Sequence, residues 1–200
     1  MNNYQAKHAS NNQKDEPKAV PFYKSCLQVI FLSAIFLGCY YLLFTFVLAN
    51  ESVSGLSMQP TFENNDRLIA VRHTNLQRGD VVILKAPDNP GAFYIKRIIG
   101  MPGDTVSSKN DITYINGKPL REKYLDEYKN SLPKGQLYTN NFSLKKLFNV
   151  SRVPKNSYFV MGDHRNISKD SRIIGFIKKK DIVGEVKLRY FPINKIQIFK

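Results

Sequence analysis

The stretch LQVIFLSAIFLGCYYLLFTFVL, residues 27–48, decides how this 200-residue chain is organised. It contains no charged side chain, and its clearly polar members are Gln28, Ser33 and Thr45. A helix of this length spans roughly 33 Å, close to the hydrocarbon thickness of a bilayer at about 30 Å. The stretch is apolar on every face, whereas a core helix of a globular domain is amphipathic. It therefore predicts one transmembrane helix over residues 27–48.

A cleaved signal peptide is the alternative interpretation of this run. Val47-Leu48-Ala49 resembles a small-residue cleavage site. The apolar region of such a peptide is only ~7–15 residues long, however, which is shorter than the run observed here. The length favours a retained membrane anchor.

The flanks of the run predict its orientation. Residues 1–26 are polar and carry four lysines against two acidic residues, so we expect a disordered cytoplasmic tail. The positive-inside rule then places the N-terminus in the cytoplasm. Residues 49–200 are expected to form an extracytoplasmic domain on a single-pass protein of the plasma membrane.

The formal charge of +14 first suggests a polyanionic partner, either nucleic acid or a membrane surface. The tail accounts for +2, and residues 27–200 hold 26 basic and 14 acidic residues, a net +12. These cations are scattered among Asn and Asp without a nucleic-acid-binding motif, so we expect a phospholipid membrane and no nucleic acid as partner. Two cysteines and three histidines argue against a disulfide scaffold or a zinc site, and we expect no metal and no cofactor.

Beyond the apolar run, the pattern predicts a compact, mainly β domain. Short runs rich in β-branched residues, bounded by Gly, Pro, Asn or Asp, occur at residues 68–71, 80–84, 93–99, 112–115, 158–161, 182–190 and 196–199. Asn116-Gly117 after the fourth run is a strong hairpin signal. Residues 118–157 are polar and rich in Lys, Asn and Tyr, which predicts a peripheral insertion with short helical turns around residues 143–149.

Two residues in this domain form a candidate nucleophile and base. Ser57 lies in the sequence Ser57-Met58-Gln59-Pro60-Thr61, and a serine hydroxyl needs a base within hydrogen-bond reach. Lys96 lies inside an apolar strand, where alternation puts it and Arg97 on opposite faces. Burial lowers the pKa of a lysine, so that a neutral amine can take the serine proton. Arginine cannot do this, because its guanidinium stays protonated. A triad of Ser57, His164 and an aspartate is the weaker alternative.

Four segments together resemble the type I signal peptidases, membrane-bound serine proteases that remove signal peptides from exported proteins. In the family's order these segments are residues 57–61, 79–82, 94–104 and 162–172. The resemblance covers about residues 27–192, and the single anchor and short insertion are similar to Gram-positive members. It implies a strand-rich catalytic domain, with signal peptides of secreted preproteins as the partners.

The resemblance also implies roles for individual residues. Ser57 falls on the family's nucleophile and Lys96 on its general base. Ser168 is expected to orient the lysine amine, and Asp170 to pair with Arg172 and Arg97. Gly55 stands where many relatives place an oxyanion-binding serine, so the Ser57 N–H and a further donor would form the oxyanion hole. Residues that match the relatives' small-residue pockets are Met58, Tyr94 and Ile95, and the strand edge at residues 93–95 would receive an extended peptide that is cut after small residues such as Ala-x-Ala.

Two other classes of function share parts of this pattern. Some relatives act as chaperone-like proteins in pilus or surface-protein assembly, and these lack the nucleophile or the base. Self-cleaving repressors use a similar Ser-Lys pair but need a DNA-reading module, which residues 1–50 do not offer. His164, Asn166 and Ile167 depart from the peptidase pattern, but they lie outside the inferred catalytic contacts. Cleavage of exported preproteins is therefore the expected function.

Overall fold

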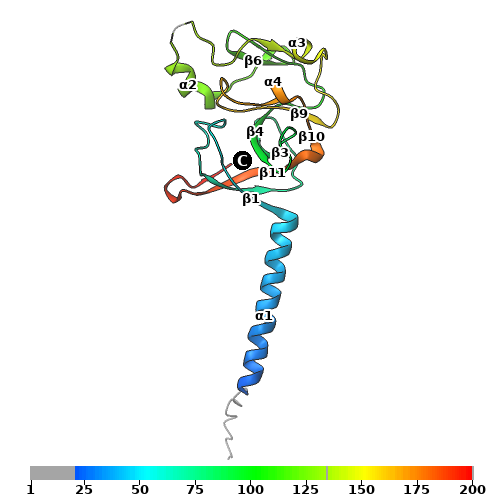
Figure 1. Ribbon diagram of the computed structural model, residues 1–200, viewed down its shortest axis with the longest axis vertical. Helices are drawn as coiled ribbons and strands as arrows, with labels where there is room; N and C mark the ends of the chain where they lie inside the picture. The colour runs from blue at the N-terminus through cyan, green and yellow to red at the C-terminus, as the bar shows by residue number, and fades with distance from the viewer. Residues whose placement is uncertain (1–20, 134, 200) are drawn as a thin grey trace, which may run out of the picture. The chain divides into compact units, whose positions relative to one another are not determined.

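A computed structural model describes residues 21–133 and 135–199 (Figure 1). Most of the predicted disordered tail, residues 1–20, lies outside the described residues. The chain divides into two compact units between Tyr40 and Tyr41. Helix α1 runs over Phe22–Leu42, with all but its last two residues in the first unit, and the chain continues as a π-helix over Leu43–Val47. Its side chains are exposed, including those of Cys26 and Cys39, and its hydropathy and length are sufficient to cross a membrane.

The apolar run ends in a strand rather than in helix. Strand β1 covers Leu48–Ser52 and pairs antiparallel with β2, with Ala49 opposite Ala70. Ala49 is buried in the core, so the last apolar residues of the run already belong to the β domain. The helix correspondingly begins five residues earlier than predicted, at Phe22.

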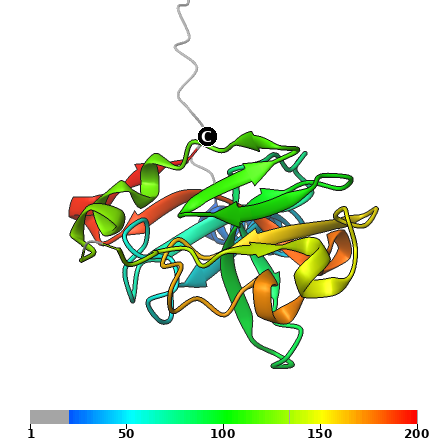
Figure 2. The same ribbon diagram turned by 90° about the horizontal axis from the view of Figure 1, so that it is seen from above.

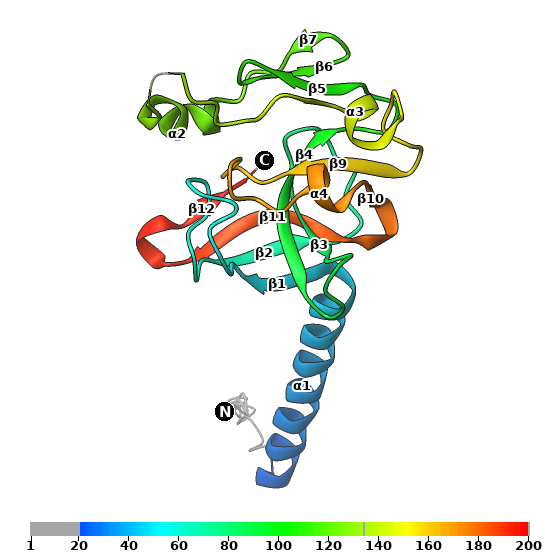
Figure 3. The same ribbon diagram turned by 45° about the horizontal axis from the view of Figure 1, so that its top comes forward.

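An antiparallel eight-stranded sheet forms most of the second unit within the described residues, in the order β1-β2-β11-β3-β4-β9-β10 with β12 on β11 (Figure 3). The bounds are β2 Arg67–Val71, β3 Val81–Lys85, β4 Phe93–Gly100, β9 Ser157–Met161, β10 Ile177–Lys178, β11 Ile182–Phe191 and β12 Gln197–Ile198. β4 pairs with β3 over residues 93–97 but with β9 only from Arg97 onward. The second edge of β4 is therefore open over residues 93–96.

A smaller four-stranded sheet, in the order β7-β6-β5-β8, lies beside β4 and β9 (Figures 2 and 3). Its strands are β5 Val106–Lys109, β6 Ile112–Ile115, β7 Lys118–Pro119 and β8 Phe142–Ser143. Short helices accompany it: a 3-10 turn over Lys123–Leu125, α2 Asp126–Ser131 and α3 Leu144–Phe148. Asn116 and Gly117 both have positive φ and connect β6 to β7, which confirms the predicted hairpin.

Three hydrophobic clusters hold the strands together. One lies beneath the segment between β1 and β2 and includes Met58, Phe62 and Leu68. A second joins the two sheets, because Ile99 of β4 and Phe159 of β9 pack with residues of the small sheet. The third lies on the opposite face of β3, β4 and β9. The remaining helical elements are α4 Ser171–Ile174 and 3-10 turns over Lys179–Asp181 and Ile193–Lys195.

The predicted mainly β class and the seven predicted strands are confirmed, as is the helical turn near residues 143–149. Strands β1, β5, β7, β8 and β10 were not predicted from the sequence. The β7, β8 and β10 segments have only two residues each, and β5, with the sequence VSSK, carries two serines. Such segments pair because the neighbouring strands offer an edge, and not because of their own composition.

Candidate active site

Ser57 lies in a turn of the segment between β1 and β2, and two buried neighbours fix that turn. The Gln59 N–H donates to the Leu56 carbonyl at 3.1 Å, and the Phe62 N–H donates to the Met58 carbonyl at 3.0 Å. The side chains of Met58 and Phe62 belong to the core beneath β1 and β2. The serine hydroxyl is therefore presented on a backbone that is anchored on its C-terminal side.

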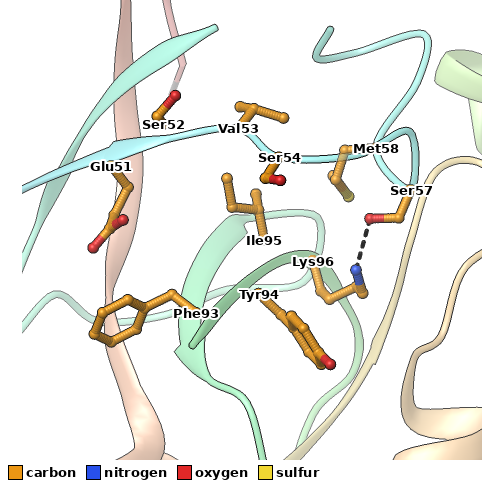
Figure 4. A pocket seen from close by; sticks show the side chains of 10 residues that line it. All are labelled: Glu51, Ser52, Val53, Ser54, Ser57, Met58, Phe93, Tyr94, Ile95 and Lys96. Atoms are coloured by element: carbon orange, nitrogen blue, oxygen red, sulfur yellow. Dashed lines mark hydrogen bonds between the residues drawn. The ribbon is translucent and has the colours of Figure 1, made fainter. Parts of the chain in front are cut away.

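Lys96 reaches Ser57 from strand β4. Its Nζ lies 2.8 Å from the Ser57 Oγ, a hydrogen-bond distance, although the two residues are 39 positions apart (Figure 4). As the predicted alternation requires, Lys96 points inward, with 3% of its surface exposed, while Arg97 points to the other face. The structure thus brings together the predicted nucleophile and the predicted base.

The environment of Lys96 favours a neutral amine. Burial lowers the pKa of Lys96 from 10.5 to about 8, and the charges of Asp170 and Asp163 act in the opposite direction. Desolvation penalises the ammonium more than these two carboxylates stabilise it. Near pH 8, about half of the molecules therefore hold a lysine able to accept a proton.

A small pocket begins at this pair. It lies between residues 51–58 on one side and the open edge of β4, residues 93–96, on the other (Figure 4). Its walls include the predicted pocket residues Met58, Tyr94 and Ile95, and its volume is about 60 Å³. Small-molecule sites typically measure ~300–1,000 Å³. The space next to Ser57 therefore suits only a small side chain.

Two buried aspartates lie behind Lys96, each bound to an arginine. Asp170 accepts hydrogen bonds from Arg172 at 2.7 and 2.8 Å, which is the predicted pairing of these two residues. It also accepts one from the Gly162 N–H at 3.0 Å. The predicted pairing of Arg97 with Asp170 is wrong. Arg97 instead donates to both oxygens of Asp163, at 2.9 and 2.6 Å. Asp163 follows Gly162 in the segment 162–172, the last of the four that resemble the family, and this position was the available signal for its role.

Known proteins match both the sequence and the fold. The sequence model described as "Signal peptidase, peptidase S26" matches residues 25–191. The chain belongs to this family. It is 42% identical to "Signal peptidase I" of Bacillus caldolyticus over 154 residues, which are 75% of this chain and 83% of that protein. It is 35% identical to "Signal peptidase IB" of Staphylococcus aureus over 87% of this chain and 94% of that protein.

A solved structure supports the same assignment. The crystal structure of a signal peptidase I from Enterococcus faecalis has 39% identity and a TM-score of 0.54 to this chain. The match covers 56% of this chain and 97% of the crystallised one. Together with the relatives, it shows that this chain has the fold of the signal peptidases and that its family is one of peptidases.

Ser168 lies at the site, but not in the predicted contact. Its Oγ is buried and has no hydrogen-bond partner among the described residues, so the expected bond to Lys96 is not formed. The Lys96 amine bonds to Ser57 instead. Gly162 allows Ser168 and the Ser57 backbone to approach it closely, because a Cβ on Gly162 would overlap both the Ser168 Oγ and the Ser57 carbonyl oxygen. Only glycine leaves room for the two serine-bearing segments to meet.

Gly55, two residues before Ser57, has a backbone conformation that favours glycine. Its φ is +90°, a conformation that side-chain-bearing residues rarely adopt. Its N–H donates to the Asn64 Oδ1 at 2.9 Å and is therefore not directed at a reacting group. The Ser57 N–H makes no hydrogen bond within residues 21–133 and 135–199, so it remains a candidate donor to an oxyanion.

The histidine alternative is not supported. The His164 Nδ1 lies 3.2 Å from the Leu56 carbonyl oxygen, and its ring packs against Tyr128 at 4.7 Å between centroids. The Ser57 hydroxyl is bonded to Lys96 and not to this imidazole. His164 contacts the nucleophile's segment through its backbone, since its N–H donates to the Ser57 carbonyl at 3.0 Å.

The insertion predicted to be peripheral contacts the catalytic segment directly. Arg165 is buried, donates to the Gly162 carbonyl at 3.0 Å and pairs with the buried Glu122 of the insertion. Its guanidinium also donates to the side-chain oxygens of Thr113, Tyr124 and Thr139. The Tyr124 ring lies 4.0 Å from the Arg97 guanidinium. Glu122 and Tyr124 were not predicted from the sequence, because a single acid and a single tyrosine in a polar stretch give no signal.

Among the described residues, no group of three or more His, Cys, Asp or Glu side chains is arranged to hold a metal ion.

Proposed function

We propose that the chain is a membrane-anchored serine endopeptidase that removes signal peptides from exported preproteins. The observation that supports this most directly is the 2.8 Å contact between the Ser57 Oγ and a buried Lys96 whose pKa is about 8. Family membership supports signal-peptide removal, and the contact supplies the residues that would carry out the chemistry.

In this proposal, the neutral Lys96 amine takes the Ser57 proton as the Oγ attacks the carbonyl carbon of the scissile bond. The Ser57 N–H donates to the developing oxyanion. The Lys96 ammonium then gives its proton to the leaving nitrogen, the C–N bond breaks, and an acyl-enzyme remains. A water molecule, deprotonated by Lys96, attacks the ester and releases the signal peptide with Ser57 restored.

The pocket supports cleavage after small residues. An extended peptide can pair with the open edge of β4 over residues 93–96, and its side chains then point into a space of about 60 Å³. Met58 and Ile95 pack against the core and cannot withdraw to admit a larger group. Replacing the alanine before the cleaved bond by phenylalanine should lower kcat/KM at least about tenfold, because the wall excludes its bulk.

Membrane anchoring and orientation are part of the proposal. The helical segment over Phe22–Val47 is long and apolar enough to cross a membrane, and no side chain of α1 is buried in the described structure. The four lysines of residues 1–26 favour a cytoplasmic N-terminus. The β domain would then act outside the plasma membrane, where exported preproteins emerge.

The test is cleavage of a purified preprotein by the full chain in detergent. Ser57→Ala and Lys96→Ala should each lower kcat about 10³-fold or more, because neither half of the pair works without the other. Lys109→Ala, which changes an exposed lysine of β5, is the matched control and should retain full activity. Near-wild-type cleavage by Lys96→Ala would disprove the pair. Absence of cleavage by the wild type would favour the chaperone-like alternative.

A further inference from the structure

The surface that residues 162–168 and α2 form next to the Ser57 turn lies outside the pocket lining and is not used by the mechanism above. All residues that line the pocket come from segments 51–58 and 93–96. Residues 162–168 and α2 contact the turn that holds Ser57 at other atoms, namely the backbone of residues 56–57 and the side chain of Gln59. The His164 N–H donates to the Ser57 carbonyl, and the His164 ring lies against the Leu56 carbonyl.

Aromatic rings form this surface, and hydrogen bonds fix them. The half-buried Tyr128 of α2 packs on His164 at 4.7 Å and stacks on Tyr138 at 5.6 Å, with 4° between the two tyrosine planes. Tyr138 is buried, and its hydroxyl donates to the Asp163 carbonyl at 2.8 Å. The Tyr128 hydroxyl donates to the Gln59 side chain at 3.2 Å. The rings are therefore held in place before any ligand arrives.

Two acidic side chains, Glu63 and Glu127, lie near Tyr128. Gln59 donates to the Glu63 carboxylate at 2.9 Å, and the charges of Glu63 and Glu127 both act on the Tyr128 hydroxyl. The exposed Leu56 adds apolar surface next to the nucleophile. A face made of ring π-systems and carboxylates attracts cations and aromatic groups and repels carboxylates.

The position of this face relative to Ser57 indicates its occupant. A substrate whose residues before the scissile bond fill the pocket must continue past Ser57 on the other side. An extended chain advances ~3.3 Å per residue, so the first two or three residues after the bond reach the rings. Leu56, Gln59, Tyr128 and His164 are together called the leaving-side surface below.

We propose that the leaving-side surface binds the first residues after the cleaved bond, which become the N-terminus of the mature protein. It prefers basic or aromatic side chains there over acidic ones. This inference rests on the proposed peptidase function and adds a second determinant of specificity to the small-residue pocket.

The test compares peptides that are identical before the cleaved bond and differ in the second residue after it. The wild-type chain in detergent should cleave the lysine peptide about three- to tenfold faster in kcat/KM than the glutamate peptide, the size of one aromatic contact. Tyr128→Ala should remove this difference. Tyr114→Ala, a partly exposed tyrosine in β6, is the control and should keep the ratio.

Two outcomes would overturn the inference. One is an unchanged lysine-to-glutamate ratio in Tyr128→Ala. The other concerns a peptide with two glycines after the bond. If Tyr128→Ala loses as much kcat/KM on this peptide as on the lysine peptide, Tyr128 has only a structural role.

Binding separates this inference from the catalytic proposal. The Ser57→Ala chain, titrated with the uncut peptides, should bind the lysine peptide three- to tenfold more tightly than the glutamate peptide, and the additional change Tyr128→Ala should equalise the two Kd values. If Ser57→Ala still cleaves, the proposed chemistry is wrong. If it is inactive but binds both peptides equally, the leaving-side surface is wrong.

Discussion

The two sheets of the β domain contribute to the site in different ways. The eight-stranded sheet positions the proposed nucleophile and base, because Lys96 lies in β4 and Ser57 follows β1. The four-stranded sheet and its insertion supply neither of these two groups, yet Glu122 neutralises the buried Arg165 of residues 162–168, which we call the catalytic loop. The small sheet and its insertion therefore support the catalytic loop, and they do so through a few buried polar contacts. The two sheets, each with the loops attached to it, are called the two layers below.

The largest expected effect comes from breaking the contact between the two layers. Glu122→Ala leaves the buried Arg165 without its carboxylate and should lower the free energy of unfolding by about 3–5 kcal/mol. Thermal unfolding of the full chain in detergent, followed by circular dichroism, measures the loss. Lys118→Ala, on the exposed strand β7, is the control. Equal Tm values for the two variants would show that the insertion does not support the catalytic loop.

A smaller effect is expected from crowding within the catalytic layer itself. Gly162→Ala places a Cβ against Ser168 and the Ser57 carbonyl, and overpacking of this kind costs about 1–3 kcal/mol. Because the Ser57 backbone must shift, kcat should fall by about 10²-fold. Asn166→Ala, an exposed change in the same loop, should leave both quantities unchanged. A Gly162→Ala variant with normal kcat would show that the close approach of the two segments is not required.

The pH dependence of kcat should show which layer carries the charges that set the pKa of Lys96. Because the reaction needs neutral Lys96, kcat should rise tenfold per pH unit up to about pH 8 and then level off. Asp163→Asn removes a charge that raises the pKa of Lys96, so its inflection should lie at lower pH. Asp126→Asn in α2 should leave the inflection in place, since the charges found to act on Lys96 are those of Asp170 and Asp163. A shared shift in both variants would refute this separation.

The smallest effect is expected at the edge of the small sheet. The Ser143 Oγ caps α3 by accepting the Lys146 N–H, so Ser143→Ala should cost about 1 kcal/mol of stability. The kcat/KM for a preprotein should not change, because Ser143 contacts no residue of the catalytic pair. Reduced activity at unchanged stability would mean that coupling between the layers extends beyond Glu122 and the tyrosines.

The sequence predicted the parts of the site that depend on local pattern. Alternation in β4 placed Lys96 inward, and the four ordered motifs led to Ser57, Asp170 and Arg172. What it could not predict were pairings between distant segments. Whether Arg97 meets Asp163 or Asp170 depends on the register between β4 and β9, in which Arg97 lies opposite Met161, close to Asp163. No composition signal carries that register.

The insertion shows the same limit more strongly. Its strands and helices are two to six residues long, and its tyrosines are spaced without a helical or strand period. Tyr124, Tyr128 and Tyr138 acquire their roles only when the chain folds back over residues 162–168. A contact of this kind becomes visible only in three dimensions.

The placement of the two thiols provides a direct measure of topology. Cys26 and Cys39 are the only cysteines of the chain, both are free and exposed on α1, and a helical rise of 1.5 Å per residue separates them by about 20 Å along its axis. In sealed vesicles, a membrane-impermeant maleimide should reach Cys26 only from the side that holds the N-terminus, while lipid shields Cys39. The two native cysteines thus report the orientation of the helix in the membrane, and no cysteine has to be introduced for the measurement.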